Sequence, residues 1–217
     1  MLMGVAPHPG TPEKTPRTQS ERRAATRFAL LDATVDCLAE EGYAKTTTRR
    51  IAERAGVTPG ALQHHFATRA ELLGHTRRHL GSKFAQEILG HASADIPSIQ
   101  LRAERLLDLM WDLLKGPLFA AMVELWVAAR TDVELRKEIA EAERDGARLA
   151  AAASHILNPE LVDRPGFTQL FATGRATMRG LAMARFVNDA GADAAWPATR
   201  AHLLGLLAQF AADAEVS

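Results

Sequence analysis

Residues 46–69, TTTRRIAERAGVTPGALQHHFATR, decide the fold of this 217-residue chain. Their apolar periodicity predicts two short helices, Thr48–Ala55 and Pro59–Phe66. Gly56 can adopt the left-handed conformation that ends the first helix. The pair Thr58-Pro59 is a start signal for the second, because a hydroxyl caps the helix and proline fits its first position. The stretch therefore predicts a helix-turn-helix, whose second helix can enter a DNA major groove.

The composition predicts an all-α fold. Apolar residues make up 47% of the chain and aromatic residues only 6%, and no β-branched alternating run is bounded by turn residues. We expect a disordered N-terminal arm over 1–19, which is rich in proline. A three-helix N-terminal helix-turn-helix DNA-binding domain follows over 20–82. It is joined to a larger helical domain over 83–217, for which a regulatory role in ligand binding and dimerisation is implied by a family resemblance of the central motif.

Outside the central motif, capping residues and helix breakers predict the other helices. Ser20 is the expected N-cap of the first helix, which runs to Glu41. Capping boxes are expected at Thr68–Glu71 and at Thr131–Glu134. The later helices are expected at Arg69–Leu89, Ile99–Lys115, Leu118–Arg130, from Thr131 towards Leu157, Phe167–Asn188 and Trp196–Ala214, with a turn at Asp189–Asp193.

The formal net charge of zero hides an asymmetry. Residues 1–81 hold 12 Lys and Arg against 8 Asp and Glu, whereas residues 82–217 hold 14 against 18. A basic N-terminal part, residues 1–81, and an acidic C-terminal part, residues 82–217, indicate two separate functions, and the basic part is the one expected to bind a polyanion.

Several classes of protein are disfavoured by the sequence. The single Cys37 allows no internal disulfide and fits a reducing compartment. No apolar run is long enough to span a membrane and no export signal is evident, so a cytoplasmic location is expected. The nucleotide-binding and hydrolase motifs are absent, which argues against an enzyme. His75 and His79 have a spacing that could hold a metal, but without an evident third ligand we expect solvated or phosphate-facing histidines, no metal and no cofactor.

The DNA contacts are expected at the starts of the two motif helices and on the outer face of the second. Helix N-termini favour phosphate, and small residues let the backbone approach the groove. Leu62 and Phe66 must point inward, so their neighbours point outward. His65 is left open between core packing and DNA contact. The candidate residues are Thr47, Thr48, Arg49, Arg50, Thr58, Pro59, Gly60, Ala61, Gln63, His64, His65 and Arg69.

The stretch TTTRRIAERAGVTPGALQHHFATRAELL, over residues 46–73, resembles the N-terminal signature of the tetracycline-repressor (TetR) family of bacterial transcription regulators. The similarity rests on IAERAGV, the glycine of VTPG, the pair His65-Phe66, the basic Arg69 and the pair Leu72-Leu73. The preceding helix, which ends in EEGY, also fits, so the motif covers roughly residues 22–73, about a quarter of the chain. The resemblance implies a homodimer that reads a palindromic DNA operator and responds to a small, largely apolar effector. It also implies that Arg69 clamps a phosphate.

Gln63 departs from that pattern, because the family usually has tyrosine at this position. Gln63 could pair with an adenine edge or reach only a phosphate, and the sequence leaves this choice, and so the operator, open.

The back domain supplies candidates for two further sites. By resemblance, the last two helices form the dimer interface, with the alternative that they only close the core. The interface candidates are Phe167, Leu170, Phe171, Met178, Leu181, Phe186, Leu203, Leu207 and Phe210. The ligand-pocket candidates are Met110, Trp111, Leu114, Phe119, Met122, Trp126, Arg175 and Met178. The alternative functions are a non-sensing architectural DNA-binding dimer and, less favoured, an enzyme.

Overall fold

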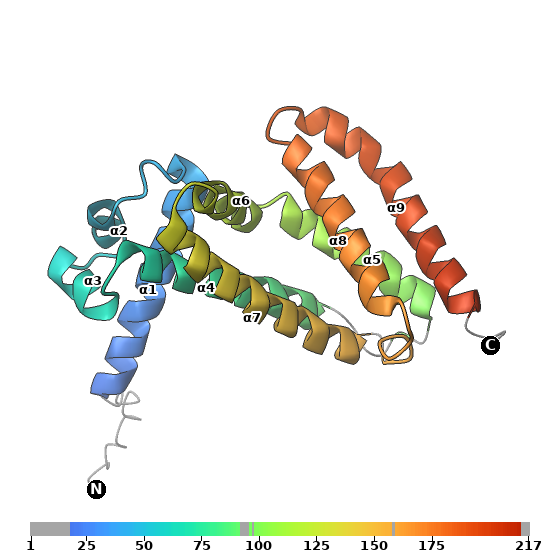
Figure 1. Cartoon of the computed structure of the whole chain (residues 1–217), viewed down its shortest axis with the longest axis horizontal. Coiled ribbons are helices and arrows are strands. Elements are labelled where there is room, and N and C mark those ends of the chain that lie inside the picture. Colours follow the sequence, from blue (N-terminus) through green and yellow to red (C-terminus); the bar gives the residue numbers. More distant parts are fainter. Residues whose placement is uncertain (1–17, 92–95, 97, 158, 214–217) are drawn as a thin grey trace, which may run out of the picture.

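The computed structural model describes residues 18–91, 96, 98–157 and 159–213, and within these ranges the regular structure is entirely helical (Figure 1). The all-α prediction is therefore confirmed for this part of the chain. The helices are α1 (Gln19–Glu41), α2 (Thr48–Arg54), α3 (Pro59–His65), α4 (Arg69–His91), α5 (Ile99–Leu114), α6 (Pro117–Ala129), α7 (Val133–Leu157), α8 (Phe167–Ala184) and α9 (Asp189–Asp213).

Helices α1, α2 and α3 pack with the start of α4 around a small apolar core. Ile51 of α2, Leu62 of α3 and Phe66 just beyond it are each at most 2% exposed, as the helix-turn-helix pattern predicts. The turn also has the predicted form, because Gly56 has a φ of 68°. The core consists of Leu30, Leu31, Ala33, Cys37, Ile51, Ala52, Leu62, Phe66 and Leu72.

The predicted start of α1 is wrong by two residues. Thr18, and not Ser20, caps the helix, and Thr18 and Glu21 form a complete capping box. Thr18 and Gln19, which the expected arm over 1–19 includes, thus belong to the start of α1, and residues 1–17 lie outside the described residues.

Two other helix starts differ from the predictions. In α7 the cap is Asp132 rather than Thr131, because the Leu135 N–H donates to Asp132 Oδ1 at 2.9 Å. In α9 the predicted turn over Asp189–Asp193 is instead the first helical turn. The Asn188 side chain caps it by accepting from the Gly191 N–H at 2.9 Å.

Helices α4 and α7 run side by side and parallel, since Gly74 faces Glu138 and Arg78 reaches Asp145 further along (Figure 1). A Cβ added at Gly74 would lie 2.8 Å from Glu138 Cβ. Glycine at this point is therefore required by the close approach of the two helices.

The helix-turn-helix and the back of the molecule share a second core. Val35, Leu38, Leu73 and Leu80 of α1 and α4 pack against α6 and α7. Helix α4 continues across the boundary predicted at residue 82, so a single rigid element connects both parts. Helices α5, α8 and α9 form the far end, with α8 and α9 antiparallel (Figure 1). None of the described helices combines the length and the apolar character needed to cross a bilayer.

Replacing Gly74 by Ala should force α4 and α7 apart, because the new methyl group would overlap the base of the Glu138 side chain. We expect a loss of about 1–3 kcal/mol in the free energy of unfolding, measured by urea denaturation. Gly90→Ala is the matched control, since a Cβ there meets nothing within 4 Å. Equal stability of the two variants would contradict the close approach.

Candidate DNA-binding surface and ligand cavity

The start of α2 exposes the predicted phosphate-facing residues. Thr47 caps the helix by accepting from the Arg50 N–H, and Thr48 and Arg49 are exposed. Arg49 pairs with Glu53 at 2.9 Å along the helix surface, and Arg50 pairs with Glu41 at 2.8 Å. Exposed pairs of this kind contribute little to stability, so both guanidiniums can exchange partners.

The start of α3 is small and open. Thr58 caps the helix by accepting from the Ala61 N–H at 3.2 Å, with Pro59 in the first turn. A Cβ added at Gly60 would have the Thr58 hydroxyl, 4.0 Å away, as its only neighbour within that range. The fold of the protomer therefore does not itself require a glycine at position 60.

The outer face of α3 carries Gln63 and His64, which are both exposed, whereas His65 is half-buried. Burial and the neighbouring charges of His64, Arg23 and Arg27 lower the pKa of His65. A neutral, half-buried imidazole at physiological pH favours the packing interpretation of His65 over phosphate binding.

Arg69 does not point outward, contrary to the prediction that it clamps a phosphate. Its Nη2 donates to the carbonyls of Tyr43 and Thr46 at 3.1 and 3.0 Å, and its Nη1 donates to the Tyr43 hydroxyl. The guanidinium carbon also lies 4.3 Å from the centre of the Tyr43 ring. Arg69 therefore fixes the turn that leads from α1 into α2.

Arg27 is a structural residue that was not predicted from the sequence. Its Nη1 donates to the carbonyl of His65 at 3.2 Å, and its guanidinium stacks 4.4 Å above the Phe66 ring. Both contacts hold the end of α3 against α1. An arginine on a helix gives no local sign of such a partner 38 positions away.

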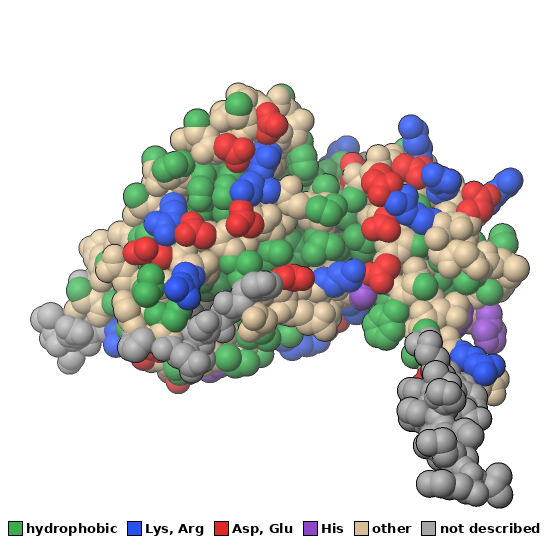
Figure 2. Space-filling model, turned by 180° about the vertical axis from the view of Figure 1, so that it is seen from behind, with side chains coloured by type: hydrophobic (Ala, Val, Ile, Leu, Met, Phe, Trp, Pro, Cys, Tyr) green, Lys and Arg blue, Asp and Glu red, His purple; other side chains and the backbone are tan. Residues whose placement is uncertain are grey.

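Basic and acidic side chains alternate over the helix-turn-helix end, at the right in Figure 2. Arg54, for example, pairs with Glu40 of α1. The modest excess of positive charge in the front of the sequence is therefore not gathered into a continuous patch on the face shown.

The same turn that Arg69 holds is also tied to the back of the molecule. The Tyr43 N–H donates to Glu124 Oε2 of α6 at 2.6 Å. Little more than one turn of α6 thus connects the entry to α2 with the interior. Met122, two positions before Glu124, lines a cavity, and Trp126, two positions after it, donates to Glu143 beside that cavity.

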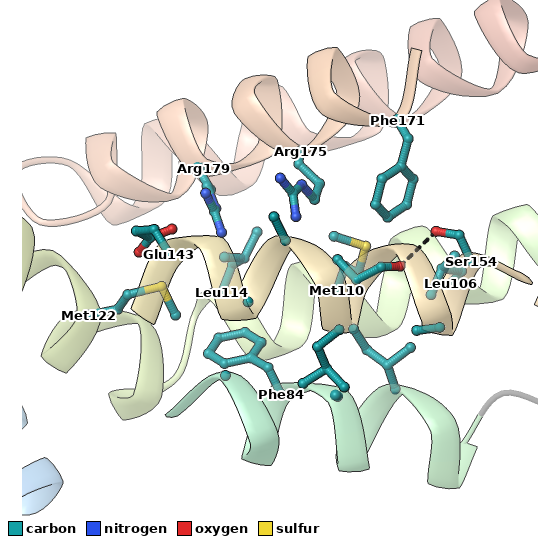
Figure 3. Close-up of a pocket in the computed structure, with 18 of the residues that line it drawn as sticks. Phe84, Leu106, Met110, Leu114, Met122, Glu143, Ser154, Phe171, Arg175 and Arg179 are labelled. Carbon is teal, nitrogen blue, oxygen red and sulfur yellow. Dashed lines mark hydrogen bonds between the residues drawn. The ribbon is translucent and has the colours of Figure 1, made fainter. Parts of the chain in front are cut away.

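The cavity has a volume of about 170 Å³ and lies between α4, α5, α6, α7 and α8 (Figure 3). Four of the predicted pocket residues line it: Met110, Leu114, Met122 and Arg175. The rest of the lining was not predicted as part of the pocket, and it includes Arg77, Phe84, Glu143 and Arg179. A second cavity of about 90 Å³ adjoins it and shares Leu106, Met110, Phe171 and Arg175.

The other predicted pocket residues lie elsewhere. Trp111 is 3% exposed and stacks on Trp196 with ring centres 4.7 Å apart, and Phe119 is fully buried. Trp126 packs edge-on against Phe119 rather than lining the cavity. Met178 lines only the second cavity. Aromatic residues at helical spacing thus mostly build the core here.

The predicted dimer residues mostly face inward. Phe167, Met178 and Leu203 are buried inside the protomer, and Leu170, Phe171, Leu181, Leu207 and Phe210 are half-buried. Phe186 is 54% exposed but stacks on Phe119. Phe167, Met178 and Leu203 therefore close the protomer's own core. The sequence did not reveal this, because an apolar stripe that faces the core and one that faces a partner have the same helical spacing.

The outer faces of α8 and α9 carry small residues instead. Ala172, Ala176 and Gly180 of α8 are exposed, as are Ala201, Gly205 and Ala208 of α9. A Cβ at Gly180 or Gly205 would meet nothing within 4 Å. These faces can therefore accept another helix at short distance.

His75 and His79 of α4 have protein partners. His79 Nε2 lies 2.8 Å from Asp32 Oδ1, and the His75 ring lies beside Phe66. The expectation of solvated or phosphate-facing rings is therefore wrong for His79, which is only 12% exposed. The described residues include no group of three or more potential ligands able to hold a metal ion.

Arg69→Gln should destabilise the protein, because the Tyr43 and Thr46 carbonyls lose a charged donor. We expect a loss of about 1–3 kcal/mol in the free energy of unfolding. Arg49→Gln, which removes an exposed arginine, should change stability by less than about 0.5 kcal/mol. Urea denaturation measures both, and an equally small effect of the two variants would refute the role of Arg69 in the turn.

Comparisons with known proteins agree with this geometry. Residues 30–76 match the model of the family described as bacterial regulatory proteins, tetR family. An uncharacterized HTH-type transcriptional regulator of Mycobacterium tuberculosis is 36% identical over 128 residues, which are 57% of this chain and 63% of the relative. An HTH-type transcriptional repressor of the same species is 39% identical over 88 residues, 41% of this chain and 45% of the repressor.

This chain thus spans about 63% of the length of the first of these relatives. A solved structure of a transcriptional regulator from Rhodococcus matches with a TM-score of 0.69 and 22% identity, over 84% of this chain and 96% of that one. At this identity the match supports the fold alone. Residues 30–76 of this chain, which contain the helix-turn-helix, thus belong to the family described as bacterial regulatory proteins, tetR family, and the chain as a whole shares the fold of the Rhodococcus regulator.

Proposed function

We propose that this protein is a DNA-binding transcriptional repressor that acts as a homodimer and is released from a palindromic operator by a small molecule. The observation that carries the DNA-binding part is the open start of α3. Gly60 has free space where a side chain would be, and Gln63 and His64 project beside it. A protein that reads DNA in this way works where the chromosome is, so we place it in the cytoplasm.

The two motif helices divide the DNA contacts between them. Thr47, Thr48, Arg49 and Arg50 at the start of α2 meet phosphates, because free N–H groups and the helix dipole favour anions there. Thr58, Pro59, Gly60 and Ala61 bring α3 close to the groove. Gln63 and His64 reach base edges or the adjoining backbone.

Pairing of two protomers supplies the second half-site that specific binding needs. The exposed small-residue faces of α8 and α9 provide the surface for it. Helices with alanine and glycine at such positions can approach closely and bury their backbones against each other. The M. tuberculosis repressor that this chain resembles supports repression as the outcome of binding.

An effector acts through α6 in this proposal. Met122 lines the cavity and Trp126 donates to Glu143 there, while Glu124 between them accepts from the Tyr43 N–H. A ligand that shifts α6 would displace the Tyr43–Thr46 turn and with it the start of α2. A coupling of about 1–3 kcal/mol changes operator affinity roughly 5- to 150-fold.

Gly60→Ala tests the DNA-binding surface. The added methyl group has room in the free protein, so stability should stay equal or rise slightly. Against a groove wall it should cost about 1–3 kcal/mol, a loss of roughly 5- to 150-fold in affinity.

The measurement is fluorescence anisotropy on DNA selected by the protein from a random-sequence library, with Gly90→Ala as the matched control. Unchanged affinity of Gly60→Ala would remove α3 from the interface. If the protein selects no sequence, the proposed repressor function is contradicted and a non-sensing architectural DNA-binding protein is favoured.

Glu124→Ala tests the coupling route. For any compound that weakens DNA binding by the unaltered protein, this variant should keep its affinity for the compound and lose most of the effect on DNA, because the acceptor for Tyr43 is gone. Isothermal titration gives the first quantity and anisotropy the second. A full effect on DNA in the variant would exclude this route.

A further inference from the structure

Four charged side chains line the 170 Å³ cavity: Arg77, Arg175, Arg179 and Glu143. Figure 3 labels the last three of them. Glu143 Oε1 accepts from Arg77 Nε and from Trp126 Nε1, each at 2.6 Å. Arg175 and Arg179 reach towards the same space from α8 (Figure 3). Three guanidiniums and one carboxylate therefore line the cavity, and only Arg77 is paired with the carboxylate.

The excess positive charge is not neutralised by the described part of the chain. No carboxylate there lies within 4.0 Å of Arg175 or Arg179. Their guanidiniums rest instead near aromatic rings, Arg175 at 5.5 Å from the centre of Phe171 and Arg179 at 4.9 Å from that of Trp126. Arg77 Nη1 and Arg175 Nε are buried without a hydrogen-bond partner, and the Arg77 side chain is only 4% exposed.

Burial acts against these charges. It lowers the pKa of Arg175, and it lowers that of Arg179 to about 10 with help from the charge on Arg175. Both groups still carry their proton at neutral pH. Burial also raises the pKa of Glu143, but the hydrogen bonds from Arg77 and Trp126 and the arginine charges outweigh it, so that the pKa is lowered overall. The cavity thus holds about two positive charges in excess.

Two glycines make room for the Arg77 head group. A Cβ at Gly81 of α4 would lie 3.2 Å from Arg77 Nη1, and one at Gly146 of α7 would lie 3.5 Å from Nη2. Glycine inside a helix costs about 1 kcal/mol relative to alanine. Helices α4 and α7 each carry such a destabilising glycine next to the buried Arg77 guanidinium, where a larger residue would leave less room for it.

We propose that the cavity binds a monocarboxylate with an apolar body, whose carboxylate lies between Arg175, Arg179 and the free Nη1 of Arg77. The inference deepens the proposed ligand response and rests on it only for the consequence on DNA. The charge recognises the acid, because a carboxylate accepts from arginine in a fixed planar geometry. The expected effector is then an acid rather than a neutral apolar compound.

The rest of the lining recognises the body of the ligand. Phe84, Ile88, Leu106, Met110 and Phe171 give the cavity apolar walls. An apolar cavity of about 150 Å³ holds a benzene ring, so 170 Å³ fits one ring or a short alkyl chain. Longer chains can extend past Met110 and Phe171 into the second cavity.

Isothermal titration in the absence of DNA tests the proposal with benzoate, octanoate, their neutral amides and acetate. We expect the two larger acids to bind roughly 10- to 100-fold more tightly than their amides, as charge-assisted hydrogen bonds imply. Acetate has the charge without the apolar body and should bind far more weakly. Arg175→Gln and Arg179→Gln should each remove the preference for acid over amide, whereas Arg148→Gln, an exposed arginine of α7, should keep it.

Three results would overturn the proposal: equal affinity for acid and amide, an unchanged preference in both α8 variants, or no binding of either larger acid at millimolar concentration. The comparison of ligands on the unaltered protein holds even if a variant fails to fold. If the protein selects a DNA sequence but binds no acid, the acid site is contradicted and the proposed repressor function is not. Acid binding without any DNA selection contradicts the repressor and supports the acid site.

Discussion

The Tyr43–Thr46 turn is the point on which both halves of the molecule depend. Arg69 holds its two carbonyls from one side, and Glu124 accepts its Tyr43 N–H from the other. Gly42 precedes it with a φ of 77°, which lets the chain leave α1 sharply. A Cβ at Gly42 would also lie 3.4 Å from Glu124 Oε2. The position of the start of α2 is therefore set jointly by Arg69 of α4 and by Glu124 of α6.

Short-range chemistry made the helix-turn-helix predictable from the sequence. The caps at Thr47 and Thr58, the glycine of the turn and the inward Leu62 and Phe66 all act within a few residues of one another. The end of α8 at Ala184 and the start of α9 at Asp189 were less predictable from the sequence. Asn188 to Gly191 suit a turn and a helix start equally well. Pro197, a residue type that suits the first turn of a helix, lies instead inside α9.

The candidate sites were predicted only in part, since residue type does not give orientation. Arg69 has the charge for a phosphate, yet its direction depends on Tyr43, 26 positions away. Trp111 has the size for a ligand pocket, yet it packs on Trp196. The charged residues of the cavity lie on three different helices, α4, α7 and α8. A search of the sequence for aromatic stripes does not reveal that Arg77, Glu143 and Arg179 line the same cavity.

Hydroxyl-radical footprinting of the protein on DNA selected from a random library tests the central claim most directly. A dimer that inserts one α3 into each half-site should protect two blocks on each strand, about one helical turn (roughly 10 base pairs) or a multiple of it apart. The protected blocks should be related by two-fold symmetry. A single protected block, or uniform protection along every fragment, would contradict the account.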